Sequence, residues 1–200
     1  SVLGIGVYGA LYGIGGPDGN GADRACTTGV ETAKEIRSLA NGEIAAIQMA
    51  RKPTDLSQIG YIDADGAATT IGENSGRVTL VNLWATWCAP CRKEMPALDR
   101  LQGELGGETF AVLPINIDTA EAAKPRAFLE SIETQNLALN TDPEMETFEA
   151  MKKRGLALGL PVTVLIDRQG CLIGHMNGPA EWDSDDAKAL IKAAIAAAGV

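Results

Sequence analysis

Two nearly continuous apolar runs stand out in the middle of the chain, Val78–Trp84 and residues 110–117. Runs of this length without alternating polar positions are typical of strands buried on both faces. Pro114 lies inside the second run and favours a bulge there, because proline has no N–H group for a strand ladder. Two further strands are expected at residues 161–166 and 171–176, joined by a tight turn.

Helical periodicity fills the segments between these runs. Residues 90–105 repeat apolar side chains at helical spacing, and so do residues 122–132 and 145–153. A last helix is expected from Asp183 or Ser184 to residue 198, since either residue can cap a helix N-terminus. The order of elements predicts an α/β fold with a mixed central sheet flanked by helices.

An extension precedes this core. Residues 27–49 carry a helical pattern that Asn41 and Gly42 interrupt, which indicates two short helices. Residues 58–63 and 67–71 are expected to form a hairpin around Asp65 and Gly66, a favourable turn pair. The fold therefore includes an N-terminal helical extension and a hairpin.

The first 14 residues are uncharged and largely apolar, although a membrane-spanning helix needs about 20 such residues. We interpret residues 1–14 as the remnant of a membrane signal anchor, residues 15–25 as a flexible linker, and residues 26–200 as the folded domain. The alternative is a glycine-rich arm left after signal cleavage. Both interpretations indicate an exported protein.

Composition excludes one class of partner. The net charge is −9 and the pI is near 4.6, whereas nucleic-acid binding needs clustered Lys and Arg. No internal repeat is present. Four cysteines in an exported chain suggest an oxidising compartment, where disulfides persist.

Cys88 and Cys91 are two residues apart at the start of the predicted helix 90–105. The partial positive charge of a helix N-terminus favours a thiolate at the first cysteine. Cys88 is therefore the expected nucleophile of thiol–disulfide exchange, and Cys91 the resolving thiol. A zinc knuckle is the alternative, but it needs a second pair of Cys or His ligands that the sequence does not supply. No metal and no cofactor besides this redox-active pair are expected.

The neighbours of the pair are expected to shape it. Pro90 fits the first helical turn, where a missing N–H costs nothing, and together with Ala89 it should tune the disulfide. Trp87 is interpreted as a packing residue and also as a flat docking surface beside Cys88. Glu94 lies one turn after Cys91, so a partly buried carboxylate there can exchange a proton with the resolving thiol. The alternative for Glu94 is an ordinary acid favoured by the helix dipole.

The string from Val81 to Pro96, VNLWATWCAPCRKEMP, resembles the TlpA, ResA and CcmG group of membrane-anchored, thioredoxin-like reductases. The resemblance covers about residues 26–197 and implies the thioredoxin fold. It implies a redox role for Glu94 and a cis Leu160–Pro161 bond that faces the cysteine pair. Cytosolic thioredoxins carry an ionisable Asp at the position of Asn82, so a proton-shuttle role falls to Glu94, to a water, or to nothing.

Cys26 and Cys171 are expected to form a structural disulfide, with two unrelated buried thiols as the alternative. Isolated cysteines at these places resemble the TlpA branch. His175, the only histidine, is a copper ligand or, as is more common for a lone histidine on a strand, an ordinary surface or core residue.

The resemblance implies a periplasmic protein, tethered to the inner membrane, that reduces disulfides in exported partners. The expected partners are copper chaperones and the copper subunit of cytochrome oxidase, with a membrane electron donor restoring the dithiol. The CcmG and ResA branch implies apocytochrome c or its maturation proteins instead. A non-enzymatic copper carrier is the alternative from another class, and a general oxidase of folding proteins is a third possibility.

Overall fold

The computed structural model describes residues 26–74, 76–119 and 123–199. The predicted anchor at 1–14 and the linker at 15–25 lie outside the described residues. Within the described part, no helix is both long and apolar enough to cross a membrane. Eight strands form one sheet in the order β1-β8-β7-β4-β5-β6-β2-β3. The strands are β1 (Gln48–Met49), β2 (Gly60–Ile62), β3 (Ala68–Thr70), β4 (Val78–Trp84), β5 (Phe110–Asn116), β6 (Asn140–Thr141), β7 (Val162–Ile166) and β8 (Leu172–Asn177).

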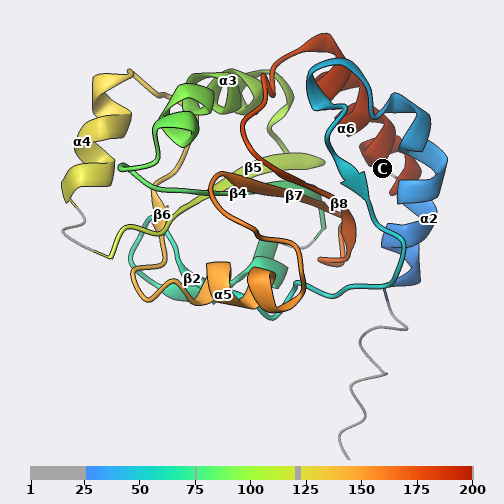
Figure 1. Ribbon diagram of the computed structural model, residues 1–200, viewed down its shortest axis with the longest axis horizontal. Coiled ribbons are helices and arrows are strands. Elements are labelled where there is room, and N and C mark those ends of the chain that lie inside the picture. Colours follow the sequence, from blue (N-terminus) through green and yellow to red (C-terminus); the bar gives the residue numbers. More distant parts are fainter. Residues whose placement is uncertain (1–25, 75, 120–122, 200) are drawn as a thin grey trace, which may run out of the picture.

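Helices cover both faces of this sheet. They are α2 (Thr27–Ile36), α3 (Ala89–Leu105), α4 (Ala123–Ser131), α5 (Glu146–Lys153) and α6 (Asp185–Ala197). In Figure 1, α3 and α6 lie on one side of the sheet and α5 lies on the other, while α2 lies beside α6. The predicted mixed sheet flanked by helices is confirmed.

The centre of the sheet is β4, whose seven residues are all buried. It pairs in parallel with β5 and antiparallel with β7, so the sheet is mixed at its core. The apolar sequence of β4 follows from this position, because both of its faces are covered.

The predicted bulge at Pro114 is wrong. The register of β4 and β5 runs without a shift from Val78 opposite Phe110 to Trp84 opposite Asn116. The carbonyl of Pro114 accepts a bond from Asn140 Nδ2, on the side of β6. The N and C=O of one strand residue point to the same side, so the missing N–H faces β6. Pairing with β6 starts only at Ile115, so the ladder loses nothing.

The second predicted helix of the extension is also wrong. After α2 the chain makes two single 3₁₀ turns, Arg37–Leu39 and Gly42–Ile44, and then enters β1. Gly42 has φ +54°, a left-handed conformation that suits glycine. Gln48 and Met49 pair with His175 and Gly174 of β8, a tertiary contact that overrides the local helical pattern. The predicted hairpin is present as β2 and β3.

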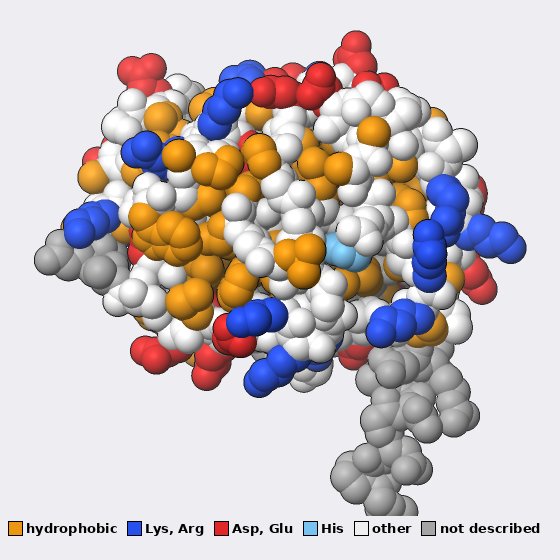
Figure 2. Space-filling model, viewed as in Figure 1, with side chains coloured by type: hydrophobic (Ala, Val, Ile, Leu, Met, Phe, Trp, Pro, Cys, Tyr) orange, Lys and Arg blue, Asp and Glu red, His pale blue; other side chains and the backbone are white. Residues whose placement is uncertain are grey.

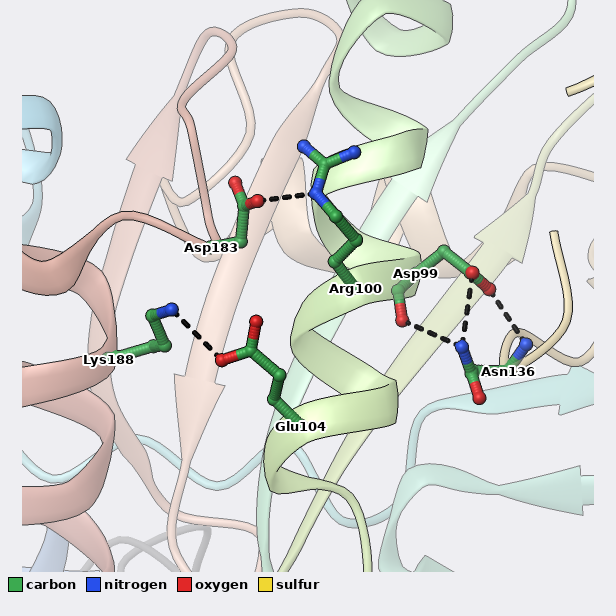
Figure 3. A network of polar contacts seen from close by, with 6 residues as sticks. All are labelled: Asp99, Arg100, Glu104, Asn136, Asp183 and Lys188. Atoms are coloured by element: carbon green, nitrogen blue, oxygen red, sulfur yellow. Dashed lines mark hydrogen bonds and ion pairs between the residues drawn. The ribbon is translucent and has the colours of Figure 1, made fainter.

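Polar contacts fix α3 to its surroundings (Figure 3). Arg100 and Glu104 of α3 pair with Asp183 and Lys188 at the start of α6. The carboxylate of Asp99 accepts bonds from the backbone N–H groups of Gln135, Asn136 and Leu137, at 3.1, 2.8 and 3.1 Å. The helix that carries the cysteine pair is thus held on two sides.

Candidate active site

The cysteine pair occupies the N-terminus of α3. Cys88 is the N-cap residue, and its Sγ accepts a bond from the N–H of Cys91 at 3.2 Å. Pro90 lies in the first turn, and a disulfide joins Cys88 to Cys91. Cys88 is 5% exposed and Cys91 is fully buried, so an incoming group reaches Cys88 first. In the reduced state, the helix dipole and the N–H of Cys91 both favour a thiolate at Cys88.

The loop between β4 and α3 is held by the strand next to it. The N–H of Thr86 donates to both carboxylate oxygens of Asp118, at 3.1 and 3.2 Å. Asn116 Nδ2 donates to the same carboxylate, and Asp118 is 9% exposed. Asp118 therefore fixes the backbone two residues before Cys88. Sequence reasoning missed this residue, because its role depends on β5 lying beside β4.

The two tryptophans of the motif have different environments. Trp84 is 1% exposed, and its ring lies 5.6 Å from that of Phe128 on α4. Trp87 is 68% exposed, directly before Cys88. Of the two interpretations of Trp87, a flat surface beside the nucleophile fits this exposure, and a packing residue does not.

Pro161 lies at the same end of the sheet as the cysteine pair. The Leu160–Pro161 peptide bond is cis. Val162, the first residue of β7, pairs with Leu83, the penultimate residue of β4. The antiparallel register therefore brings Pro161 to the end of β4 from which the chain continues into Cys88.

The loop before Pro161 is clamped by Asn177, the last residue of β8. Asn177 Oδ1 accepts from the N–H of Leu158 at 2.7 Å, and Asn177 Nδ2 donates to the carbonyl of Leu156 at 2.9 Å. The side chain of Leu158 is 83% exposed. Leu158 and Trp87 are the large hydrophobic residues exposed within the described chain. Trp87 directly precedes Cys88, and Leu158 lies in the loop before Pro161. Sequence reasoning did not single out either Leu158 or Asn177.

Glu94 lies on α3, one helical turn after Cys91, and is buried, with an exposed fraction of 3%. Its Oε1 accepts from Asn82 Nδ2 at 2.8 Å, and its Oε2 accepts from the N–H of Ala180 and from Trp182 Nε1, each at 3.2 Å. Burial raises the pKa of Glu94 to about 7, and these three donors oppose the shift. The carboxylate is thus poised to gain or lose a proton near neutral pH.

Asn82 connects the carboxylate to the sheet. Its Nδ2 also donates to Thr163 Oγ1 of β7 at 2.9 Å, while its Oδ1 is buried and has no partner among the described residues. Trp182 is buried as well, at 1%. No sequence signal showed that the N–H of Trp182 reaches Glu94, 88 positions away in the chain.

The other two cysteines form a disulfide far from this site in the chain. Cys26 precedes α2, Cys171 precedes β8, and their sulfurs are 2.07 Å apart. Both residues are buried, and the bond ties the extension to the last hairpin. His175 lies on β8, and burial lowers its pKa. Within the described residues, no group of three or more His, Cys, Asp or Glu is placed to hold a metal ion.

Comparison with known families shows that the profile of the Redoxin family matches residues 47–191. Thioredoxin-like protein YneN of Bacillus subtilis is 30% identical over 109 residues, which cover 54% of this chain and 60% of YneN. Thiol-disulfide oxidoreductase ResA of Halalkalibacterium halodurans is 27% identical over 131 residues, which cover 65% of this chain and 71% of ResA. Thiol:disulfide interchange protein HelX of Rhodobacter capsulatus is 29% identical over 68% of this chain and 72% of HelX.

Solved structures agree on the fold. A chain from Chlorobium tepidum described as thiol:disulfide interchange protein DsbE superposes with a TM-score of 0.61 at 24% identity, covering 73% of this chain and 99% of that one. A thiol-disulfide oxidoreductase structure from Bacteroides vulgatus gives a TM-score of 0.55 at 25% identity, over 68% and 90% of the two chains. These neighbours confirm the expected thioredoxin fold.

Proposed function

Because the chain belongs to the redoxin family, we propose that it is a reductant of disulfides in exported partner proteins. Its class, a protein thiol–disulfide oxidoreductase of the ResA and DsbE type, follows from the named relatives. The direction of electron flow, the partners and the location belong to the proposal. The observation that carries it is the cysteine pair at the N-terminus of α3, with Cys88 as the N-cap residue.

The proposed reaction transfers two electrons and two protons to the partner. The Cys88 thiolate attacks one sulfur of the partner disulfide, forms a mixed disulfide, and releases one partner sulfur as a thiolate that takes up a proton. Cys91 then loses its proton and attacks Cys88 Sγ. The Cys88–Cys91 disulfide forms, and the second partner sulfur leaves and is protonated. A dithiol donor at the membrane restores the pair by the reverse exchange.

Glu94 is proposed as the group that accepts the proton of Cys91. It follows Cys91 by one helical turn, and its pKa of about 7 makes the carboxylate available near neutral pH. Asn82 cannot titrate, so its part is to hold the carboxylate through the 2.8 Å bond. Ala89 and Pro90 set the geometry of the first turn, and Leu160 and Pro161 border the partner's approach.

The finer proposal places the protein in the TlpA branch. On this proposal it is periplasmic, tethered to the inner membrane through residues 1–14, and it reduces cysteine pairs of copper chaperones and of the cytochrome oxidase copper subunit. The separate Cys26–Cys171 disulfide supports an oxidising location. Exposed Trp87 and Leu158 support an apolar contact with a protein partner.

The test traps the partner. Cys91→Ser removes the resolving thiol, so the mixed disulfide with Cys88 should accumulate and can be isolated from the periplasm under non-reducing conditions. Cys88→Ser is the matched control, because it leaves one thiol but removes the nucleophile. Isolating copper-handling proteins supports the TlpA branch, and apocytochrome c or its maturation proteins indicate the CcmG and ResA branch, which the relatives named ResA favour.

The direction is tested by the equilibrium of Cys88–Cys91 with glutathione. A potential near that of thioredoxin, about −270 mV, supports a reductase, whereas one near that of DsbA, about −120 mV, indicates an oxidase. Tight Cu(I) binding that needs both cysteines, together with no exchange with an oxidised dithiol target, would indicate a copper carrier instead.

A further inference from the structure

A second pocket lies along the edge strand β1 and is lined by neither cysteine of the pair nor Glu94. Its volume is about 570 Å³, within the range of roughly 300–1,000 Å³ that is usual for ligand sites. The lining includes residues 47–52, Arg37, Arg154, Leu156 and His175. We call it the β1 pocket.

The β1 pocket carries charge of one sign. Arg37, Arg51, Lys52 and Arg154 line it, and no Asp or Glu does, although the whole chain has a net charge of −9. All four side chains are exposed, and none has an ion-pair partner among the described residues. Figure 2 shows Lys and Arg side chains to the right of and below the pale blue histidine on this face of the molecule.

The pocket also borders a sheet edge that has no strand partner among the described residues. β1 is the last strand of the sheet, so one of its edges has no neighbouring strand among the described residues. The N–H of Ala50 donates to the carbonyl of Ile173 in β8, at 2.8 Å. Backbone groups of successive strand residues point to opposite edges, so the N–H and C=O of Met49 face away from β8. An unpaired edge of this kind is a template for another extended segment.

Two of the cations project from this edge. The chain leaves β8 after Ala50 and rejoins it at Thr54, whose carbonyl accepts from the N–H of Leu172 at 3.0 Å. Arg51 and Lys52 lie in the segment between these two contacts. Arg37 comes from the 3₁₀ turn after α2, and Arg154 follows α5. The four cations thus come from three separate segments around the pocket, and all of them are exposed.

We propose that the β1 pocket binds an extended acidic peptide segment of a partner protein. The segment adds to the free edge of β1, and its carboxylates pair with Arg37, Arg51, Lys52 and Arg154. Addition of a strand supplies main-chain bonds, while alternate side chains supply specificity. Apolar lining from Ile47 and Leu156 receives the side chains that alternate with the acidic ones. A small anion would use the charges but leave the open edge unused.

His175 belongs to the same lining. It pairs across the ladder with Gln48 of β1, and its Nδ1 atom is buried without a hydrogen-bond partner in the described chain. The site would give a thiol–disulfide oxidoreductase a second contact with a protein partner. It does not depend on the proposed reduction, because the cysteine pair takes no part in it.

The test uses the full-length oxidised protein, so no thiol exchange enters the result. The probe is a fluorescein-labelled, end-capped peptide of alternating Val and Glu, six residues long, and binding is followed by fluorescence anisotropy. Arg37→Glu combined with Arg154→Glu should weaken binding by about tenfold or more, because two cation–carboxylate contacts become repulsive. Arg126→Glu with Lys192→Glu, two exposed cations outside the pocket, is the control with the same change in net charge.

A second arm needs no variant of the protein. Two versions of the peptide carry N-methyl groups on alternate residues, one on the Val residues and one on the Glu residues. Each keeps its charges but cannot donate backbone hydrogen bonds from one of its edges. One of the two should therefore bind at least about tenfold more weakly than the other. Equal binding of both N-methylated peptides, or displacement by pyrophosphate at the same concentration as the acidic peptide, would show a simple anion site and overturn strand addition. No binding of the peptide, or equal binding of a Val and Lys peptide, would overturn the proposal altogether.

Discussion

Asn82 donates a hydrogen bond of 2.8 Å to Oε1 of Glu94, while the other carboxylate oxygen, Oε2, accepts from Ala180 and Trp182. Oε2 is an acceptor for two fixed donors, so a proton taken up by Glu94 belongs on Oε1. Asn82 Oδ1, which is buried and has no partner among the described residues, can accept a hydrogen bond from the protonated carboxyl group if the amide turns over. The Asn82 amide can thus serve both charge states of Glu94.

The first prediction concerns pH and stability. Burial raises the pKa of Glu94 from 4.5 to about 7, so between these values the folded protein holds a proton that the unfolded chain has lost. The contribution of Glu94 to the free energy of unfolding should therefore fall as pH rises from about 4.5 to 7 and stay level above pH 7. Glu94→Gln removes this loss. Between pH 4.5 and 7, the free energy of unfolding of the variant should therefore rise by about 3 kcal/mol relative to that of the wild type. Urea unfolding at pH 4.5, 6 and 8 measures it, with exposed Glu130→Gln as control.

The same variant should change catalysis. If Glu94 takes the proton of Cys91, the rate of resolving a mixed disulfide in the wild type should rise with pH through about 7. In Glu94→Gln this rise near pH 7 should be absent, and only the titration of the thiols should remain in the pH profile. Stopped-flow release of the second partner thiol between pH 5 and 9 checks it. An unchanged profile would remove Glu94 from the proton path.

The donors to Glu94 should set its pKa. Asn82→Ala removes a bond that lowers the pKa of Glu94, so the pH midpoint of the rate should move to higher pH. Trp182→Phe removes the Nε1 donor to Oε2 and should shift the midpoint in the same direction. Direct titration of Glu94 by carboxyl-carbon NMR gives both shifts. A shift to lower pH in either variant would contradict the argument.

Asp118 should act through the loop before Cys88. Asp118→Ala leaves the N–H of Thr86 without its acceptor, and we expect a loss of about 1–3 kcal/mol in stability. The rate at which the Cys88 thiolate attacks a disulfide reagent should fall as well, because the loop that positions Cys88 is less firmly held. Asp118→Asn keeps an acceptor oxygen and should recover much of both losses. Equal loss in the two variants would mean that the charge, not the position of the loop, is what matters.

The Cys26–Cys171 disulfide should stabilise without reacting. It closes a sequence separation of 145 residues, for which chain entropy gives up to about 5 kcal/mol. The double substitution Cys26→Ser and Cys171→Ser should lower the free energy of unfolding by a large part of that amount. The exchange rate of Cys88 in the folded double variant should equal that of the wild type, and a changed rate would assign the bond a redox role.

Local pattern was sufficient for the main elements. The apolar run Val78–Trp84 forms a strand with the bounds that the sequence predicts, because a segment without alternating polar positions has no stable place except between two covered faces. The cysteine pair and Pro90 mark the start of α3 for a similarly local reason, since a cap and a first-turn proline act within one turn. The spacing of Glu94 from Cys91 likewise predicts that it lies one turn along the same helix, and its role in proton exchange stays a prediction.

Long-range contacts decided the rest. Residues 48 and 49 follow a helical pattern, yet they form a strand because β8 offers an edge to pair with. Asp118, Asn177 and Trp182 enter the site from positions 32, 19 and 88 residues away from their partners, so spacing could not reveal them.

The sequence by itself therefore determined the sheet core, the helix that carries Cys88 and Cys91, and the chemistry of that pair, since each depends on neighbours along the chain. Only the tertiary structure decided the protonation of Glu94. Its pKa near 7 results from burial where α3 meets β4 and the loop before α6, which the chain brings together on folding. Desolvation is a property of the assembled core, and no local pattern encodes it.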